Sequence, residues 1–247
     1  MNIRFLLPFT LICFLLINGC AVNPVTGKQD LVLLSENDEI SLGRKTNQQV
    51  LQQYSVYDNP ALQKYVQDIG NKLAANSHRN NLVYRFTVLD SKEVNAFALP
   101  GGYIYITRGL MAYLKSEAEL AAVLGHEIGH VTARHSVRQY SATQFANIGL
   151  ALGSAFIPGM NQTSSQFAQL FGAALLRGYG REHELEADRL GAEYLARTNY
   201  NPRAMLDVIR VLKDQEVFER EQAKKEGREP RIYRSEERRV GKECRSR

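Results

Sequence analysis

The chain contains one five-residue pattern that is suited to binding a metal ion and activating water. His126, Glu127 and His130 form an H-E-x-x-H pattern, written HEIGH in this sequence. On a helix, residues four apart lie on one face, so both imidazoles can bind the same ion. Zinc accepts two such nitrogens at about 2.0–2.1 Å and leaves room for a third ligand and a water molecule. Glu127, next to His126, is suited to act as the general base on that water.

A third metal ligand has to come from another part of the chain, and helix phasing selects it. The stretch 181–188 (REHELEAD) offers four acidic residues. Glu184 and Asp188 align with small and apolar residues, so they face inward, where a carboxylate needs a strong partner. Glu186 aligns with other charged residues and is expected on a solvated face. We therefore predict that Glu184 is the third ligand of one zinc ion and that Asp188 fixes the tautomer of a ligand histidine.

The other three histidines do not fit this ligand set. His135 is five residues from His130 and off the ligand face of the helix, so we interpret it as a surface residue. His183 adjoins Glu184 but faces elsewhere, which favours a structural role. His78 lies near a predicted helix end and is expected to be solvated.

Helices and short strands must position these residues. Ser116 and Glu119 form a capping box that begins the HEIGH helix. Further helices are predicted over 35–54 and 59–75, and a last one begins at Asn201-Pro202 and ends at Gly227. Alternation and β-rich composition predict strands at 82–89, 94–99 and 103–107. The expected fold class is α+β: mainly helical, with a small sheet beside the active-site helix.

These motifs together resemble the HtpX-like and CAAX-prenyl-protease family of zinc metallopeptidases, in its periplasmic, BepA-like branch. The HEIGH helix is followed about fifty residues later by Glu184-x-x-x-Asp188, and 94–110 (VNAFALPGGYIYITRGL) is also similar to the family. The similarity covers roughly residues 35–225. It implies a zincin-type fold, one Zn²⁺ ion, Glu184 as third ligand, and a role in outer-membrane protein quality control beside the outer-membrane assembly machinery.

An extended substrate is expected to lie against the strand formed by Asn95, Ala96, Phe97 and Ala98 as an added strand. Such main-chain recognition suits unfolded or misassembled envelope proteins as substrates. The alternative is a non-enzymatic lipoprotein chaperone that binds outer-membrane proteins and holds a structural zinc. A structural zinc site usually has four protein ligands, whereas this sequence supplies three and a base, which favours catalysis.

The first twenty residues predict export and lipid attachment. Arg4 precedes an apolar run of about thirteen residues, too short to span a bilayer. Residues 16–20 (LINGC) resemble a bacterial lipobox, in which cleavage precedes the cysteine and the cysteine receives the lipid. Ala21 then favours the outer membrane. We expect a periplasmic protein that is anchored in the membrane through Cys20; the alternative is an ordinary cleaved signal with an incidental cysteine.

These patterns divide the chain into four parts. Residues 1–19 are the lipoprotein signal peptide, 20–34 a tether, 35–227 the zinc metallopeptidase domain, and 228–247 a charged tail that we interpret as artefactual or truncated. Much of the formal charge of +5 lies in this tail, so no basic stripe remains to bind nucleic acid. Residues 21–243 contain no cysteine, which excludes a thiol nucleophile or a thiolate ligand there.

Overall fold

The computed structural model describes residues 20–153 and 179–230, and a three-stranded sheet lies at its centre. The strand order is β3 (Arg85–Leu89), β5 (Tyr103–Thr107), β4 (Ala96–Leu99). β3 pairs with β5 in parallel and β4 pairs with β5 antiparallel, so β4 is an edge strand of this sheet. The predicted signal peptide and nearly all of the predicted tail lie outside the described residues.

The predicted alternation along the first strand is confirmed. Tyr84, Phe86 and Val88 are buried, while Val83 and Arg85 are exposed. The ladder itself begins at Arg85, three residues later than predicted. β4 likewise starts two residues later than predicted, at Ala96. Both faces of β4 and β5 are covered, because successive side chains enter two different apolar clusters.

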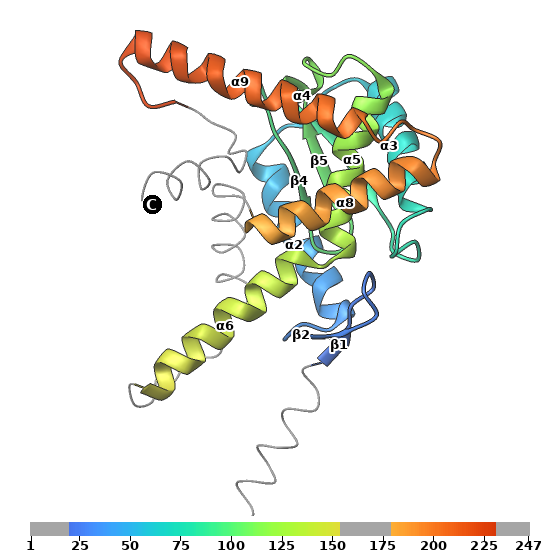
Figure 1. Ribbon diagram of the computed structural model, residues 1–247, viewed down its shortest axis with the longest axis vertical. Helices are drawn as coiled ribbons and strands as arrows, with labels where there is room; N and C mark the ends of the chain where they lie inside the picture. The colour runs from blue at the N-terminus through green and yellow to red at the C-terminus, as the bar shows by residue number, and fades with distance from the viewer. Residues whose placement is uncertain (1–19, 154–178, 231–247) are drawn as a thin grey trace, which may run out of the picture.

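Helices cover the two faces of the sheet (Figure 1). α3 (Pro60–Ala74) and α5 (Glu117–Thr132) contribute to the larger apolar cluster on one face. α2 (Glu36–Gln53) contributes to the smaller cluster on the other face. α8 (Arg181–Arg197) packs along α5, and α9 (Ala204–Glu226) also contacts α5. The helix that carries the HEIGH pattern, α5, is therefore enclosed by the sheet and by helices, and the mainly helical α+β class is confirmed.

The capping box at the start of α2 is complete, whereas the one predicted for α5 is not. Ser35 and Asp38 form a complete capping box at the start of α2. Ser116 caps α5 by accepting from Glu119 N, but the Glu119 carboxylate accepts from Lys115 N at 2.7 Å instead of completing the box. The start of α5 is still fixed by one side-chain cap, which sets the phase of the histidines along the helix.

The last helix begins later than predicted. Residues 201–203 form a turn, closed by a hydrogen bond from Ala204 N to Asn201 O, and α9 starts at Ala204. Its predicted end is confirmed: Gly227 adopts the left-handed conformation at φ 66° and caps the helix. The remaining helices of the described ranges are the short α4 (Arg108–Met111) and the longer α6 (His135–Gly153).

The segment expected to be a tether forms a small hairpin on the domain. β1 (Cys20–Val22) and β2 (Gln29–Leu31) pair antiparallel. Asn23 closes the turn by accepting from Val25 N and Thr26 N at 2.9 and 3.0 Å. These turn bonds and the contact of β2 with α6 give a defined place to residues 20–31, for which the sequence predicted a tether.

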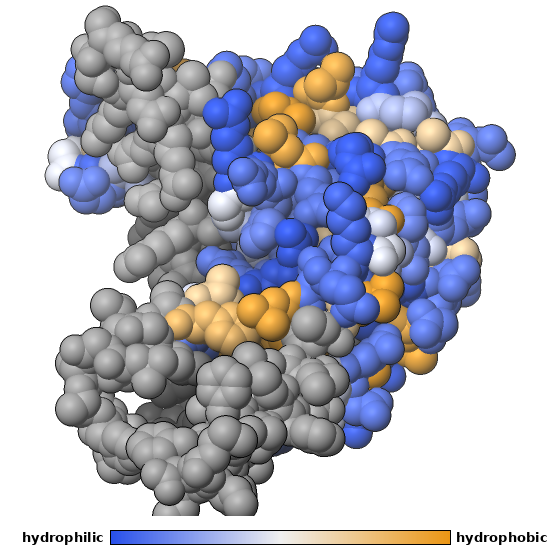
Figure 2. Space-filling model, turned by 60° about the horizontal axis from the view of Figure 1, so that its bottom comes forward, coloured by the Kyte–Doolittle hydropathy of each residue, from blue (hydrophilic) through white to orange (hydrophobic). Residues whose placement is uncertain are grey.

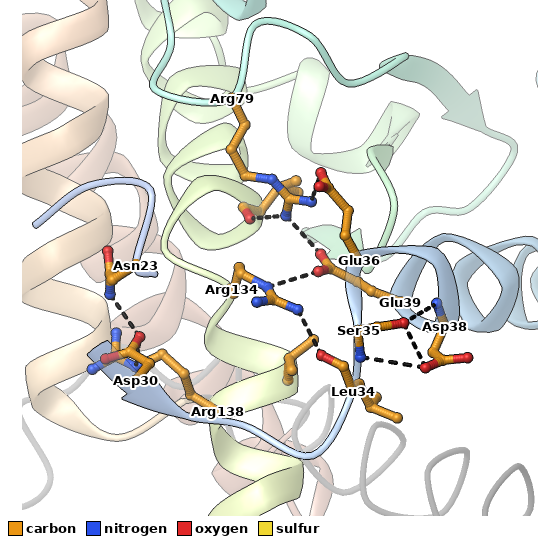
Figure 3. Close-up of polar contacts among 12 residues, drawn as sticks. Asn23, Asp30, Leu34, Ser35, Glu36, Asp38, Glu39, Arg79, Arg134 and Arg138 are labelled. Atoms are coloured by element: carbon orange, nitrogen blue, oxygen red, sulfur yellow. Dashed lines mark hydrogen bonds and ion pairs between the residues drawn. The ribbon is translucent and has the colours of Figure 1, made fainter. Parts of the chain in front are cut away.

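A buried charged cluster joins α2 to the end of α5 (Figure 3). Glu39 on α2 is 1% exposed and binds two arginines: Arg79 Nη1 at 2.7 Å and Arg134 Nε at 2.8 Å. Arg79 also donates to Val131 O at 3.1 Å. Arg134 adopts a left-handed conformation at φ 55° between α5 and α6. This cluster fixes the turn that directly follows the HEIGH helix.

Candidate active site

Glycines let α5 and α8 approach backbone to backbone. A Cβ at Gly129, inside the HEIGH pattern, would lie 2.9 Å from Ala187 O on α8. A Cβ at Gly191 would lie 2.9 Å from His126 N on α5. Side chains at these positions would push the helices apart. The close approach brings the acidic face of α8, with Glu184, over the two histidines of α5.

Three side chains converge with the spacing that a zinc ion needs. His126 Nε2 and His130 Nε2 lie 3.0 Å apart. Glu184 Oε2 lies 3.4 Å from the first nitrogen and 3.9 Å from the second. Tetrahedral bonds of about 2.0–2.1 Å place zinc ligand atoms about 3.3–3.4 Å apart, close to these separations. Two imidazoles and a carboxylate are also ligands that zinc prefers, so the three residues fit one zinc ion.

Neighbouring groups orient two of these side chains. Asp188 Oδ1 lies 2.8 Å from His126 Nδ1, on the opposite side of the ring from Glu184. Glu184 Oε1 accepts from Tyr179 N at 3.2 Å, which leaves Oε2 facing the histidines. Burial alone would lower the pKa of His126, but the hydrogen bonds to Asp188 and Glu184 outweigh burial and raise this pKa well above its usual value. Asp188 therefore lies at Nδ1 of His126, where a hydrogen bond determines which ring nitrogen carries the proton.

Glu127 lies inside the same enclosed site. Its side chain is buried, and the residue is 4% exposed. Burial raises the pKa of Glu127 to about 7, opposed by the charge of His126 and reinforced by that of Glu184. A bound cation would stabilise the carboxylate and lower this pKa. A carboxylate with these neighbours is suited to taking up a proton and giving it back at neutral pH.

Two expectations about side chains near the site are wrong. His135 has no exposed side-chain surface, and its Nδ1 lies 2.8 Å from Nδ1 of His130. Its Nε2 lies 3.1 Å from Glu186 Oε2, and Arg138 Nη1 donates to the same oxygen at 2.9 Å. The hydrogen bond from His135, followed by that from Arg138, lowers the pKa of Glu186 to about 2 against the effect of burial. Glu186 therefore does not lie on a solvated face, because α6 covers it.

The remaining histidines lie outside the ligand set. His183 stacks on His135 with ring centroids 4.4 Å apart, in agreement with the predicted structural role. Burial lowers its pKa to about 4. His78 is not simply solvated: its Nδ1 lies 2.8 Å from the Tyr194 hydroxyl, and its side chain is 21% exposed.

The proposed substrate strand lies next to His130. Ala96, Phe97 and Ala98 belong to edge strand β4, and Asn95 precedes it. Within the described ranges, no other strand pairs with the outer edge of β4. A shallow hollow separates β4 from the end of α5. Its lining includes residues from β4 and the turn after it, and from α5, the following turn and the start of α6: Ala98, Leu99, Pro100, His130, Val131, Arg134 and Ser136.

The fold and the His-His-Glu arrangement define a zincin-type metallopeptidase. The family model described as Peptidase family M48 matches residues 60–236, and the chain belongs to this family. The family resemblance found in the motifs is thereby confirmed, and with it the class of metalloendopeptidase.

Curated relatives share this class. The chain is 32% identical to the beta-barrel assembly-enhancing protease of Yersinia pestis, over 79% of this chain and 42% of the relative. It is 31% identical to the protease of the same name from Escherichia coli K12, over 74% and 39%. It is 35% identical to the mitochondrial metalloendopeptidase OMA1 of Arabidopsis thaliana, over 60% and 30%. The chain spans about two fifths or less of the length of these relatives.

Replacing Glu184 by Gln is expected to lower the zinc content of the purified protein substantially. The substitution keeps the shape of the side chain but removes the negative charge that faces the two histidines at 3.4 and 3.9 Å. Glu182→Gln is the matched control, because Glu182 is exposed on the same helix. Metal analysis after dialysis measures both variants. Equal zinc content in the two proteins would contradict the ligand role of Glu184.

Proposed function

We propose that this chain is a zinc-dependent endopeptidase of the bacterial cell envelope that cleaves unfolded or misassembled outer-membrane proteins. The observation that carries the proposal is the convergence of His126, His130 and Glu184 beside the buried Glu127. Membership of family M48 supports the metallopeptidase class. The envelope location and the substrates go beyond the family and rest on the arguments below.

His126, His130 and Glu184 would hold the zinc ion. When bound, zinc polarises the scissile carbonyl and makes a water molecule more acidic. Glu127 takes the proton of the attacking water and passes it to the leaving amine. Asp188 holds His126 through its Nδ1, so that Nε2 would be free to bind the ion.

An extended substrate binds along the outer edge of β4. Its main chain adds to the sheet as a further strand, and backbone hydrogen bonds place few demands on the substrate side chains. Residues of β4 and His130 line the same shallow hollow, which supports a substrate position close to the proposed metal site. Only a chain segment without stable structure of its own can adopt this extended form, which favours unfolded substrates.

The names of two relatives support the choice of outer-membrane substrates. Both the Yersinia pestis and the Escherichia coli proteins are called beta-barrel assembly-enhancing proteases. Proteins that form such barrels expose unpaired strands before the barrel closes. These strands are extended segments of the kind that β4 is suited to bind.

Casein hydrolysis tests the proposed activity directly. The purified protein, with its zinc content measured, should cleave casein, lose activity when a chelator is added, and recover it with zinc. A protein that binds zinc and unfolded clients but cleaves neither casein nor an unfolded outer-membrane protein would support the non-enzymatic chaperone instead.

The hairpin supports attachment of the domain to a membrane at Cys20. Val22, Leu31 and Leu33 on or next to the hairpin are exposed, although they are apolar. Figure 2 turns this end of the molecule forward and shows apolar patches on a mostly hydrophilic face. Within the described residues, no helix has both the length and the apolar character needed to cross a bilayer. A lipid on Cys20 would hold these apolar side chains near the membrane surface.

Cys20→Ser is expected to release the protein from the membrane fraction or to leave the precursor unprocessed. Serine has no thiol to receive the lipid, so a lipobox signal cannot be completed. Membrane fractionation and the mass of the N-terminal peptide measure the effect. Cys244→Ser, outside the signal, is the control and should fractionate like the unchanged protein. Unchanged fractionation and processing of the Cys20 variant would remove the lipoprotein proposal.

A further inference from the structure

His130 has a polar neighbour whose hydrogen-bond direction can be assigned. Nε2 of His130 faces His126 and Glu184, so a metal ion there needs the lone pair of this nitrogen. The ring proton of a neutral His130 is then on Nδ1. This Nδ1 lies 2.8 Å from Nδ1 of His135, which must accept the hydrogen bond.

The hydrogen-bond donors and acceptors can be assigned in the same way from His135 to Glu186. A neutral His135 that accepts at Nδ1 carries its own proton on Nε2. This nitrogen lies 3.1 Å from Glu186 Oε2, a carboxylate oxygen that can only accept when ionised. Arg138 Nη1 donates to the same oxygen at 2.9 Å and keeps the carboxylate charged. Each proton along the chain from His130 to Glu186 therefore has one donor and one acceptor.

The outer end of this chain reaches the N-terminal hairpin. Arg138 Nε lies 3.6 Å from Asp30 Oδ2 on β2. Asp30 in turn accepts from Asn23 Nδ2 at 2.7 Å, within the turn of the hairpin (Figure 3). Residues from three separate elements, β2, α6 and α8, are thus joined to one histidine of α5.

Each histidine of α5 is linked to a carboxylate, one of them directly and the other through a third residue. Asp188 contacts His126 directly, with a carboxylate oxygen 2.8 Å from its Nδ1. On the side of His130, the carboxylate of Glu186 is one residue farther out, and His135 connects the two. His135 has no exposed side-chain surface, and the Glu186 side chain is 17% exposed, so water competes little for these bonds.

We propose that His135 is a positioning residue for the metal site: with Glu186 and Arg138 it holds His130 in the tautomer and orientation that bind zinc. Asp30 of the hairpin steadies the outer end of the chain. This inference rests on the proposed zinc site and names the residues that support it from outside. Loss of such outer support typically lowers metal affinity by about 10–100-fold.

Two variants of His135 separate the hydrogen bond from packing. His135→Leu keeps apolar bulk but offers His130 no acceptor, so zinc affinity should fall by about 10–100-fold. His135→Asn can place its amide oxygen near the position of Nδ1 and should recover much of the affinity. His78→Leu, which removes a histidine bonded to Tyr194 away from the site, is the control and should bind zinc normally. Competition with a chromophoric chelator on the full chain measures each affinity.

A second pair of variants tests the outer end of the chain and leaves His135 itself unchanged. Glu186→Ala leaves His135 Nε2 without its acceptor and should weaken zinc binding by about tenfold. Glu182→Ala on the exposed face of α8 should not weaken it. The Co²⁺-substituted proteins add a spectroscopic test, because altered visible bands report a changed ligand geometry.

The outcomes distinguish this inference from the proposed function. Wild-type zinc affinity in both His135→Leu and Glu186→Ala would overturn the positioning role while leaving the zinc site intact. Equal losses in the Leu and Asn variants of His135 would attribute the effect to packing and also overturn it. An unchanged protein that binds no zinc would remove the proposed function and this inference together.

Discussion

Glu127→Gln is expected to give a folded, zinc-loaded protein whose peptide hydrolysis is close to background. Gln has the size and shape of Glu but cannot take the proton of the attacking water. The loss of a general base typically costs about 10²–10⁴ in rate, and the enclosed position of Glu127, 4% exposed, leaves little room for bulk water to substitute as the base. The ligand atoms of His126, His130 and Glu184 are unchanged, so zinc content should stay normal.

Zinc content and casein hydrolysis are measured on the same preparation. The variant should still bind an extended substrate along β4, so it should retain unfolded clients that the active protein releases as fragments. Glu182→Gln on the exposed face of α8 is the matched control and should keep full activity. Substantial chelator-sensitive hydrolysis by the Glu127 variant would show that another group is the base.

Glu39→Gln is expected to lower the free energy of unfolding by about 3–5 kcal/mol, because removing one partner of a buried ion pair leaves an uncompensated charge. Glu39 is 1% exposed and binds Arg79 and Arg134 at 2.7 and 2.8 Å. These arginines are 4% and 7% exposed and cannot turn to water without disturbing the end of α5. The loss of stability should also loosen the turn that places His135.

Glu36→Gln is the matched control for this measurement. Glu36 binds the same Arg79 at 2.9 Å, but its side chain is 52% exposed. An exposed ion pair contributes about 0–1 kcal/mol, so this variant should remain close to the unchanged protein. Chemical denaturation of both variants measures the difference. Equal stabilities would show that the buried cluster is not held by the charge of Glu39.

Local periodicity explains what the sequence predicted well. A helix repeats every 3.6 residues, so the spacing of His126 and His130 places both rings on one face wherever that helix lies. The same phasing separated Glu184 and Asp188 from their acidic neighbours, and the structure brings both to the histidines. Alternation along β3 likewise identified its buried side chains. These features depend on backbone geometry within one element.

Local sequence patterns did not predict how the elements around the site pack against it. Phasing along α5 placed His135 away from the ligands, but α5 ends at Thr132 and Arg134 turns the chain at φ 55°. This left-handed residue is held by Glu39 from α2 and by Leu34 O, both about a hundred residues away in sequence. The turn carries His135 back to His130, which no period of a single helix predicts.

Glu186 shows the same division between sequence and tertiary structure. The sequence determined that Glu186 points away from the face of Glu184, and the structure agrees with that direction. Whether the direction leads to water depends on what packs there, and α6 supplies His135 and Arg138. The sequence by itself thus determined the metal-binding pattern, the faces of its helices and the strands. Only tertiary packing decided which groups support His130, because those contacts join elements that no local period relates.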